Sequence, residues 1–229
     1  MFGGVREAIV SGVTEAGDRD AVVEACRTLA ASGLNRGTSG NVSLRRGDVV
    51  LVSPSGVMPE RLRAEDIAAM PIEGGGAWSG PLRPSTEWQF HLDILRARPE
   101  MAAVVHCHPT YATALSIARR AIPACHYMIA TFGGSDVRCA PYALFGSAAL
   151  SAHAVAALAG RNACLLANHG TIVCAPSLER ALWLAVELET LAAQYWHSLT
   201  LGPVLLSEAE VAEAVEAFRG YGVQAARPA

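Results

Sequence analysis

The sequence predicts a three-layer α/β domain in which helices cover both faces of a central mixed, largely antiparallel sheet. Short β-branched and apolar runs alternate with longer helical segments, and this alternation is typical of layered α/β folds. Neighbouring runs that are separated only by a tight turn indicate hairpins, so the sheet is not expected to be uniformly parallel. The 229 residues are 52% hydrophobic. No repeat or composition shift divides them, which predicts a single domain over residues 1–229.

The first half of the chain alternates strand-like runs with two helical segments, each bounded by a recognisable signal. Gly33 ends the first helix and Pro99 ends the second, because glycine and proline interrupt helices. Thr86 and Gln89 have the spacing of a capping box, which predicts that the second helix starts at Ser85-Thr86. The expected elements are a helix from residue 18 or 20 to about 31, two strands within 41–52, a turn at 53–56, a strand at 67–72 and a helix at 85–98.

The second half contains the longest expected helix and 22 uncharged residues between Arg138 and Arg161. That stretch is long enough to cross a membrane, but Pro141, Gly146 and His153 within it favour a turn followed by an alanine-rich helix. We therefore expect no membrane span. The expected elements are a strand at 102–108, a helix at 109–120, strands at 127–131 and 137–140, a helix at 147–160, strands at 163–167 and 171–174, and helices at 177–199 and 207–219.

The charged residues exclude several classes of function. The formal net charge is −3, whereas a nucleic-acid-binding protein is expected to present a basic face. All 18 basic residues are arginine, so the protein cannot form a lysine Schiff base or anchor pyridoxal phosphate through lysine. Any carbonyl chemistry needs another electron sink, and a metal ion is the leading candidate.

The cysteines and the N-terminal residues indicate the cellular compartment of the protein. The six cysteines form no CxxC pair and lie mostly in apolar runs, which predicts buried free thiols. Free thiols fit a reducing compartment. Residues 1–13 contain the acidic Glu7 and no long apolar segment, so we expect no signal peptide and a cytoplasmic location.

Three histidines fall at the ends of two expected strands. His106 and His108 are two residues apart at the end of the strand at 102–108, so their side chains share one face of the sheet. His169 follows the run at 163–167, immediately before Gly170. Three neutral imidazoles can ligate a catalytic zinc ion that keeps one position open. Each could equally be a structural histidine, and only the combination favours a metal site.

The other four histidines have simpler explanations. His91 lies on an expected helix, His153 lies in the alanine-rich helix, and neither has an evident partner. His197 lies near the end of the longest helix, where a cation suits the helix dipole. His126 precedes Tyr127 in an apolar context and is a candidate for supporting a metal ligand.

Glu87 is the strongest candidate among the carboxylates. It follows Ser85-Thr86 at the start of an expected helix, where the dipole stabilises an anion, although such a glutamate is also common without any function. Turns and helix starts can bind phosphate through neutral N–H and O–H groups. Segments of this kind lie at residues 38–41, 53–56 and 85–86.

These motifs resemble, in kind and in order, those of the class II aldolase/adducin family over residues 20 to 223. The similarity is closest to the family members that cleave L-fuculose 1-phosphate. The matching stretches are GTSGNVS (37–43), SPSGV (53–57), PSTEWQFH (84–91), AVVHCHPTYATALS (103–116), IPACHYMIATFGG (122–134), APYALFG (140–146), LLANHGTIVC (165–174) and LERALWLAVELETLAAQY (178–195).

The resemblance implies a role for each group of residues. One Zn²⁺ per subunit would be ligated by Glu87, His106, His108 and His169. Glu87, displaced from the metal, would then act as the base, and Tyr127 from a neighbouring subunit would act as the acid on the aldehyde oxygen. The phosphate would be held by Thr38, Asn41, Ser55, Gly56, Ser85 and Thr86, and the aldehyde side would be lined by Phe145, Phe218 and Tyr221.

The implied reaction is the reversible cleavage of a ketose 1-phosphate into dihydroxyacetone phosphate and an aldehyde by a homotetramer with active sites at subunit interfaces. Cleavage leaves a carbanion that becomes a zinc-bound enediolate, because zinc supplies the Lewis acid that spreads its charge.

Several related activities remain alternatives. Relatives act on 5-deoxyribulose or 5-methylthioribulose 1-phosphate, and others decarboxylate 3-oxo-tetronate 4-phosphates. Epimerases carry an aspartate where this chain has Glu87, and adducin-like proteins lack the full histidine set, so both are disfavoured. One methylene in a specificity pocket is worth only about 1–3 kcal/mol, so the sequence leaves the aldehyde undefined.

Overall fold

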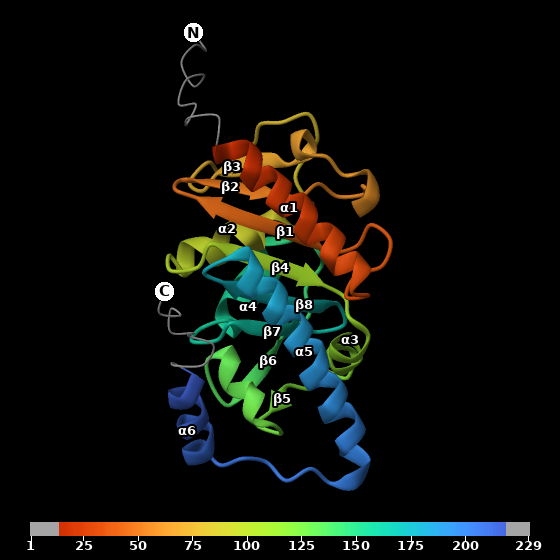
Figure 1. Cartoon of the computed structure of the whole chain (residues 1–229), viewed down its shortest axis with the longest axis vertical. Coiled ribbons are helices and arrows are strands. Elements are labelled where there is room, and N and C mark those ends of the chain that lie inside the picture. Colours follow the sequence, from red (N-terminus) through yellow and green to blue (C-terminus); the bar gives the residue numbers. More distant parts are fainter. Residues whose placement is uncertain (1–13, 219–229) are drawn as a thin grey trace, which may run out of the picture.

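The computed structural model describes residues 14–218, whose strands form one eight-stranded sheet in the order β3-β2-β1-β4-β8-β7-β6-β5 (Figure 1). Tyr221 and residues 1–13, for which we expect no signal peptide, lie outside the described residues. The strands are β1 (Asn41–Arg46), β2 (Val49–Val52), β3 (Ala68–Pro71), β4 (Ala103–Cys107), β5 (Ile122–Pro123), β6 (Asp136–Ala140), β7 (Ala163–Leu166) and β8 (Gly170–Ala175).

The pairing within this sheet is mixed and largely antiparallel, as the sequence predicts. Strands β6 and β7 run parallel, and the other neighbouring pairs run antiparallel. The pairing of β1 with β4 places Asn41 opposite His106, and the pairing of β4 with β8 places Ile172 on the other side of His106. The register therefore brings three strands together around His106.

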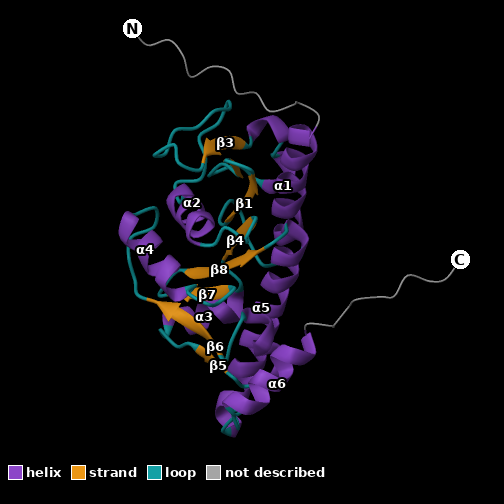
Figure 2. Cartoon of the chain, turned by 90° about the vertical axis from the view of Figure 1, so that its left-hand side faces the viewer, coloured by secondary structure: helices purple, strands orange, loops and turns teal. Residues whose placement is uncertain are grey.

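Helices pack on both faces of the sheet, which gives the expected three layers (Figure 2). Helices α2 and α4 contribute to one buried apolar cluster, and α1, α3, α5 and α6 contribute to the other. The helices are α1 (Thr14–Ala31), α2 (Trp88–Ala97), α3 (Thr110–Ile117), α4 (Ala148–Ala157), α5 (Leu178–Ser198) and α6 (Glu208–Phe218), with short 3₁₀ helices η1 (Pro59–Arg61), η2 (Ala64–Asp66), η3 (Tyr127–Phe132) and η4 (Leu199–Leu201).

Strand β4 shows why its sequence is a continuous apolar run. Val104 faces the cluster under α2 and α4, whereas Val105 faces the cluster under α1 and α5, because successive side chains of a strand point to opposite faces. Both residues are fully buried. His106 follows on the α2 face, so the first metal-ligand candidate is inserted into the core beside Phe90.

Two local expectations are wrong. The strand expected at 127–131 is instead the 3₁₀ helix η3, in which Ile129, Ala130 and Phe132 are all buried. A short apolar run does not distinguish a buried strand from a buried helical turn. The capping box is also absent, because Glu87 rather than Thr86 is the N-cap of α2 and no side chain caps the helix there.

The uncharged stretch behaves as predicted, whereas the cysteines do so only in part. All six cysteines are free, but Cys107, Cys164 and Cys174 are buried while Cys26, Cys125 and Cys139 are half-buried. The uncharged stretch contains a turn and α4, for which Ser147 is the N-cap and accepts a hydrogen bond from the Leu150 N–H. Within residues 14–218, no helix combines the length and the apolar character that a membrane span requires.

Candidate metal centre and active site

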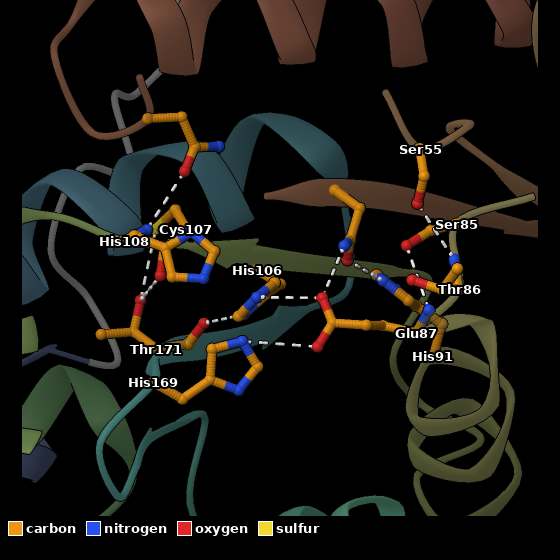
Figure 3. Close-up of polar contacts among 12 residues, drawn as sticks. Ser55, Ser85, Thr86, Glu87, His91, His106, Cys107, His108, His169 and Thr171 are labelled. Atoms are coloured by element: carbon orange, nitrogen blue, oxygen red, sulfur yellow. Dashed lines mark hydrogen bonds and ion pairs between the residues drawn. The ribbon is translucent and has the colours of Figure 1, made fainter. Parts of the chain in front are cut away.

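The three histidines predicted from the strand ends converge at one place in the structure (Figure 3). His106 is the penultimate residue of β4, His108 follows that strand, and His169 directly precedes β8. Their ligand nitrogens all lie within 4.8 Å of one another. The ring centroids of His106 lie 4.5 Å from His108 and 4.8 Å from His169.

The turn that carries His169 has specific backbone requirements. Asn168 has a φ of +55°, in the left-handed region that asparagine tolerates better than most residues. Its side-chain Oδ1 accepts a hydrogen bond from Arg119 Nε at 3.0 Å. A Cβ atom at Gly170 would lie 2.6 Å from the Cys107 carbonyl oxygen and 2.7 Å from the His108 ring. Glycine at position 170 thus allows the two strand ends to approach.

The hydrogen bond of His106 determines which of its nitrogens faces the centre. His106 Nδ1 lies 2.9 Å from the carbonyl oxygen of Thr171, and since a carbonyl only accepts, Nδ1 must carry the proton. In the neutral ring Nε2 then keeps its lone pair, and it lies 3.2 Å from Glu87 Oε2. Glu87 Oε1 lies 3.4 Å from His169 Nε2. Lone pairs of nitrogen and oxygen therefore face each other in a buried space.

A metal ion accounts for this arrangement. Buried polar atoms normally have hydrogen-bond partners, yet Glu87 Oε1, His106 Nε2 and His108 Nδ1 have none among the described residues. Three imidazoles and one carboxylate form a donor set that suits Zn²⁺. His106, His108 and His169, with Glu87, would hold the ion, and the Thr171 carbonyl orients His106 in the way that metal-binding histidines require.

The electrostatics of the cluster favour the protonation states that a metal needs. Burial lowers the pKa of His108 to about 3 and that of His169 to about 4, with a further contribution from His106, so both rings are neutral near pH 7. Burial alone would raise the pKa of Glu87, but His106, His169 and Asn41 together lower it to about 2. An anionic carboxylate beside neutral imidazoles is the state in which these ligands bind metal.

Glu87 is held in place by the loop before α2. Its N–H donates to Ser85 Oγ at 3.2 Å, and the Thr86 N–H donates to Ser55 Oγ at 3.1 Å. The second bond connects the loop to the turn at 53–56. A Cβ atom at Gly146 would lie 2.7 Å from the Thr86 carbonyl oxygen, so the segment after β6 also packs closely against this loop.

A pocket of about 300 Å³ opens above the cluster. Among the residues with a predicted role in phosphate binding, Thr38, Asn41 and Ser55 line it, and Ser85 and Thr86 are tied to its wall through the bonds just described. Gly56 follows Ser55 in the turn with a φ of +77°. The lining residues are Thr38, Ser39, Gly40, Asn41, Ser55, Glu87, His108, Tyr142, Ala143, Phe145, Asn168 and His169, and none is a cation.

The residues with a predicted role on the aldehyde side are divided between two places. Phe145 lines the pocket above the histidines. Tyr127 instead lines a separate pocket of about 490 Å³ along α5, and its ring stacks on Phe218 with centroids 6.1 Å apart. Tyr127 is 54% exposed. Within one chain the structure does not bring Tyr127 or Phe218 to the histidine cluster.

The expectation for His126 is wrong within this chain. Its Nδ1 accepts the Met128 N–H at 3.4 Å, and its ring packs on Tyr127. His126 thus caps η3 rather than supporting a metal ligand.

Sequence reasoning missed the residues that orient the cluster. The buried Asn35 accepts the His108 N–H at 3.1 Å. For His91 the sequence predicted only a position on a helix. In the structure it is fully buried and hydrogen-bonded to Asn41 and Ser43. Only the spacing of four residues between Glu87 and His91, one helical turn, could have indicated that the two side chains share a face.

Known proteins similar to this chain share its family and fold. Residues 20–196 match the family of class II aldolase and adducin N-terminal domains. A 5-methylthioribulose-1-phosphate/5-deoxyribulose-1-phosphate aldolase of Rhodospirillum rubrum is 47% identical over 211 residues, which are 92% of this chain and 95% of that protein. The L-fuculose phosphate aldolase of Escherichia coli strain K12 is 45% identical over 205 residues, 89% of this chain and 94% of that protein.

A solved structure of an L-fuculose 1-phosphate aldolase has a TM-score of 0.86 at 34% identity and covers 92% of this chain and 98% of its own. The sequence match, the fold and the histidine cluster agree with one another. The chain therefore belongs to the class II aldolase and adducin N-terminal domain family, and it is an enzyme of the lyase class, a metal-dependent aldolase.

Proposed function

We propose that the protein is a zinc-dependent aldolase that reversibly cleaves a ketose 1-phosphate into dihydroxyacetone phosphate and an aldehyde. The observation that carries this proposal is the convergence of three histidines on the Glu87 carboxylate, at a pocket lined by neutral donors. Zinc, when bound, supplies a Lewis acid that polarises the substrate carbonyl and spreads the negative charge left by C–C cleavage.

The walls of the pocket are suited to holding the phosphate. Hydroxyl and amide groups of Thr38, Asn41 and Ser55 line it, and Ser85 and Thr86 hold the adjoining loop. Neutral donors at turns and helix starts bind phosphate without a cation. We assign Thr38, Asn41, Ser55, Gly56, Ser85 and Thr86 to this task.

Glu87 is positioned to transfer the proton of the three-carbon fragment. In the condensation direction it takes a proton from C3 of dihydroxyacetone phosphate, and C3 then attacks the aldehyde carbon. Tyr127 of a neighbouring subunit gives its hydroxyl proton to the aldehyde oxygen, which becomes the new hydroxyl group. The exposure of Tyr127 and its place outside the pocket of its own chain support this assignment between subunits.

Assembly follows from the same assignment. A homotetramer with active sites at the subunit interfaces would place Tyr127, and with it Phe218, on the aldehyde side of the next subunit opposite Phe145. The role that the resemblance implies for Tyr221 stays part of this proposal. The six free thiols support a cytoplasmic location.

Two substrate classes are supported about equally. The E. coli relative is named for L-fuculose phosphate and the R. rubrum relative for 5-methylthioribulose and 5-deoxyribulose 1-phosphates. All these ketoses share the dihydroxyacetone phosphate fragment and differ only in the aldehyde. The aldehyde side therefore decides between them.

A condensation assay tests this function. The zinc-loaded protein is incubated with dihydroxyacetone phosphate and, separately, L-lactaldehyde, acetaldehyde or methylthioacetaldehyde, and the ketose 1-phosphate is detected by mass spectrometry. We expect product with at least one aldehyde and none after chelation, with Glu87→Gln as the matched control. No product with any aldehyde, together with decarboxylation of a 3-oxo-tetronate 4-phosphate, would replace the aldolase assignment.

A further inference from the structure

A continuous hydrogen-bonded chain runs from the core of the protein to Glu87. His91 Nδ1 lies 2.8 Å from Ser43 Oγ, and His91 Nε2 lies 2.6 Å from Asn41 Oδ1. Asn41 Nδ2 donates to Glu87 Oε2 at 3.0 Å. Asn41 and Ser43 share a face of β1, and Glu87 and His91 lie one turn apart at the start of α2. Figure 3 shows the His91 ring beside the Glu87 side chain, on the side away from the three clustered histidines.

The Glu87 carboxylate and the neutral His91 ring together determine the direction of every bond in this chain. A carboxylate accepts but cannot donate, so Asn41 must turn its NH₂ group toward Glu87 and its Oδ1 toward His91. An amide oxygen also only accepts, so His91 Nε2 must carry a proton. Burial lowers the pKa of His91 to about 3, so the ring is neutral near pH 7 and Nδ1 carries no proton. The Ser43 hydroxyl, which can donate or accept, therefore donates to Nδ1. The other tautomer of His91 would turn the Asn41 oxygen toward the carboxylate.

We propose that His91 is a positioning residue that commits the Asn41 amide to a single orientation, so that one side chain presents N–H groups to two anions. The first anion is Glu87, which receives one N–H of Asn41. The second is the substrate phosphate, because the amide NH₂ carries a second hydrogen and Asn41 lines the pocket. This inference rests on the proposed function for the phosphate, whereas the bonds to Glu87 are independent of it.

Burial protects the hydrogen bonds of His91 and Asn41 from competition by water. His91 is fully buried and Asn41 is 5% exposed, so water does not compete for their bonds. An unpaired buried acceptor is costly, so without the His91 donor the orientation that turns the Asn41 NH₂ group toward Glu87 would lose part of its stabilisation. In the opposite orientation the amide oxygen would face both anions and repel them.

Neutron diffraction tests the orientation directly. Crystals of the zinc-loaded wild-type protein grown in D₂O should show deuterium on His91 Nε2 and none on Nδ1, with the ND₂ group of Asn41 toward Glu87. Deuterium on Nδ1, alone or with Nε2, overturns the proposal. This measurement does not depend on turnover, so it separates a failure of the network from a failure of the proposed function.

Variants test the consequence. His91→Phe keeps the ring volume but removes both nitrogens, and His91→Gln restores an N–H donor near the position of Nε2. With one zinc retained per subunit, we expect His91→Phe to lower kcat by at least about tenfold and to weaken inhibition by inorganic phosphate by at least about threefold, the scale of one unpaired buried group. His91→Gln should recover most of both losses.

If His91→Phe and His91→Gln lose kcat and phosphate inhibition equally, His91 acts through packing and the proposal is overturned. The proposal is also overturned if His91→Phe leaves both quantities unchanged. Ser43→Ala is the matched control, because it removes only the partner of Nδ1, and we expect it to have the smallest effect of the three. If His91→Phe does not fold, the proposal is tested by the neutron result and by the comparison of His91→Gln with Ser43→Ala. Absence of aldolase activity in the wild type would remove the proposed function and leave the tautomer assignment standing.

Discussion

The histidine cluster and the Tyr127–Phe218 surface differ in how firmly the chain holds them. His106 is fully buried, Glu87 is 6% exposed, and both have fixed hydrogen-bond partners. Tyr127 is 54% exposed and packs on His126 and Phe218. The two regions line different pockets of the same chain.

This difference indicates how the proposed reaction is divided. Groups that bind metal and move the proton at C3 need orientation to a fraction of an ångström, and one chain supplies them with partners on β1, β4, β8 and α2. Tyr127, which we propose acts on the aldehyde, is exposed, and under this proposal a second copy completes the site there. Changes in the first region should therefore abolish the chemistry, and changes in the second should affect only the step that involves the aldehyde.

The largest expected effect is the loss of the metal. His106→Ala and His169→Ala should each remove bound zinc and all measurable turnover, because each deletes a ligand from the set. Elemental analysis after gel filtration measures the metal directly. His197→Ala, an exposed histidine on α5, is the control and should keep one zinc per subunit. Full occupancy in the two ligand variants would remove the proposed site.

Glu87→Gln is expected to have the next largest effect. The amide keeps the shape of the side chain but cannot accept the C3 proton, so turnover should fall by at least about 10²-fold, the scale of losing a general base. Steady-state kinetics measures this loss. A near-normal rate would reassign the base to another residue.

Tyr127→Phe should have a smaller and more selective effect. Cleavage and condensation should slow by about 10- to 100-fold, within the range for a general acid, whereas exchange of the C3 hydrogen of dihydroxyacetone phosphate should continue at the wild-type rate. An equal loss of both activities would contradict a role confined to the aldehyde.

Co-expression of Glu87→Gln with Tyr127→Phe tests whether the two residues of one active site come from different subunits. If Tyr127 serves the neighbouring subunit, mixed oligomers contain some sites with both groups intact, and random assembly of equal amounts gives about a quarter of wild-type activity. Sites formed within one chain would recover nothing beyond the activity of the separate variants.

The smallest expected effect concerns the helix behind His108. Both carboxylate oxygens of Glu189, on α5, accept N–H groups at the start of α3, from Tyr111 at 2.8 Å and from Ala112 at 2.9 Å. Glu189→Ala leaves these donors without their partner, which costs about 1–2 kcal/mol for a group that water partly reaches. Calorimetry should show a Tm lower by a few degrees. Glu187→Ala, two residues earlier on α5, is the control and should change Tm less.

The sequence predicted the parts of the site that depend on local spacing. His106 and His108 are two residues apart at the end of one strand, and His169 lies next to another, so strand periodicity and turn residues identify them as candidate metal ligands. Most elements follow from the same local signals, including the hairpin of β1 and β2 and the start of α4 after Ser147.

Contacts between distant elements were not predictable in this way. The pairing of His91 with Asn41 joins residues 50 positions apart, and nothing in either local sequence indicates it. The segment at 127–132 is apolar enough for a strand, but His126 and Gly133 cap it as a 3₁₀ helix. An apolar run of this length does not by itself distinguish a strand from a buried helical turn.

The measurement that tests the central claim most directly is hydrogen exchange in dihydroxyacetone phosphate. The zinc-loaded protein is incubated with this compound in D₂O, and loss of the C3–H signal is followed by NMR with and without a chelator. We predict stereospecific exchange that the chelator abolishes and that Glu87→Gln greatly slows. No exchange from the fully metallated protein would contradict the aldolase mechanism.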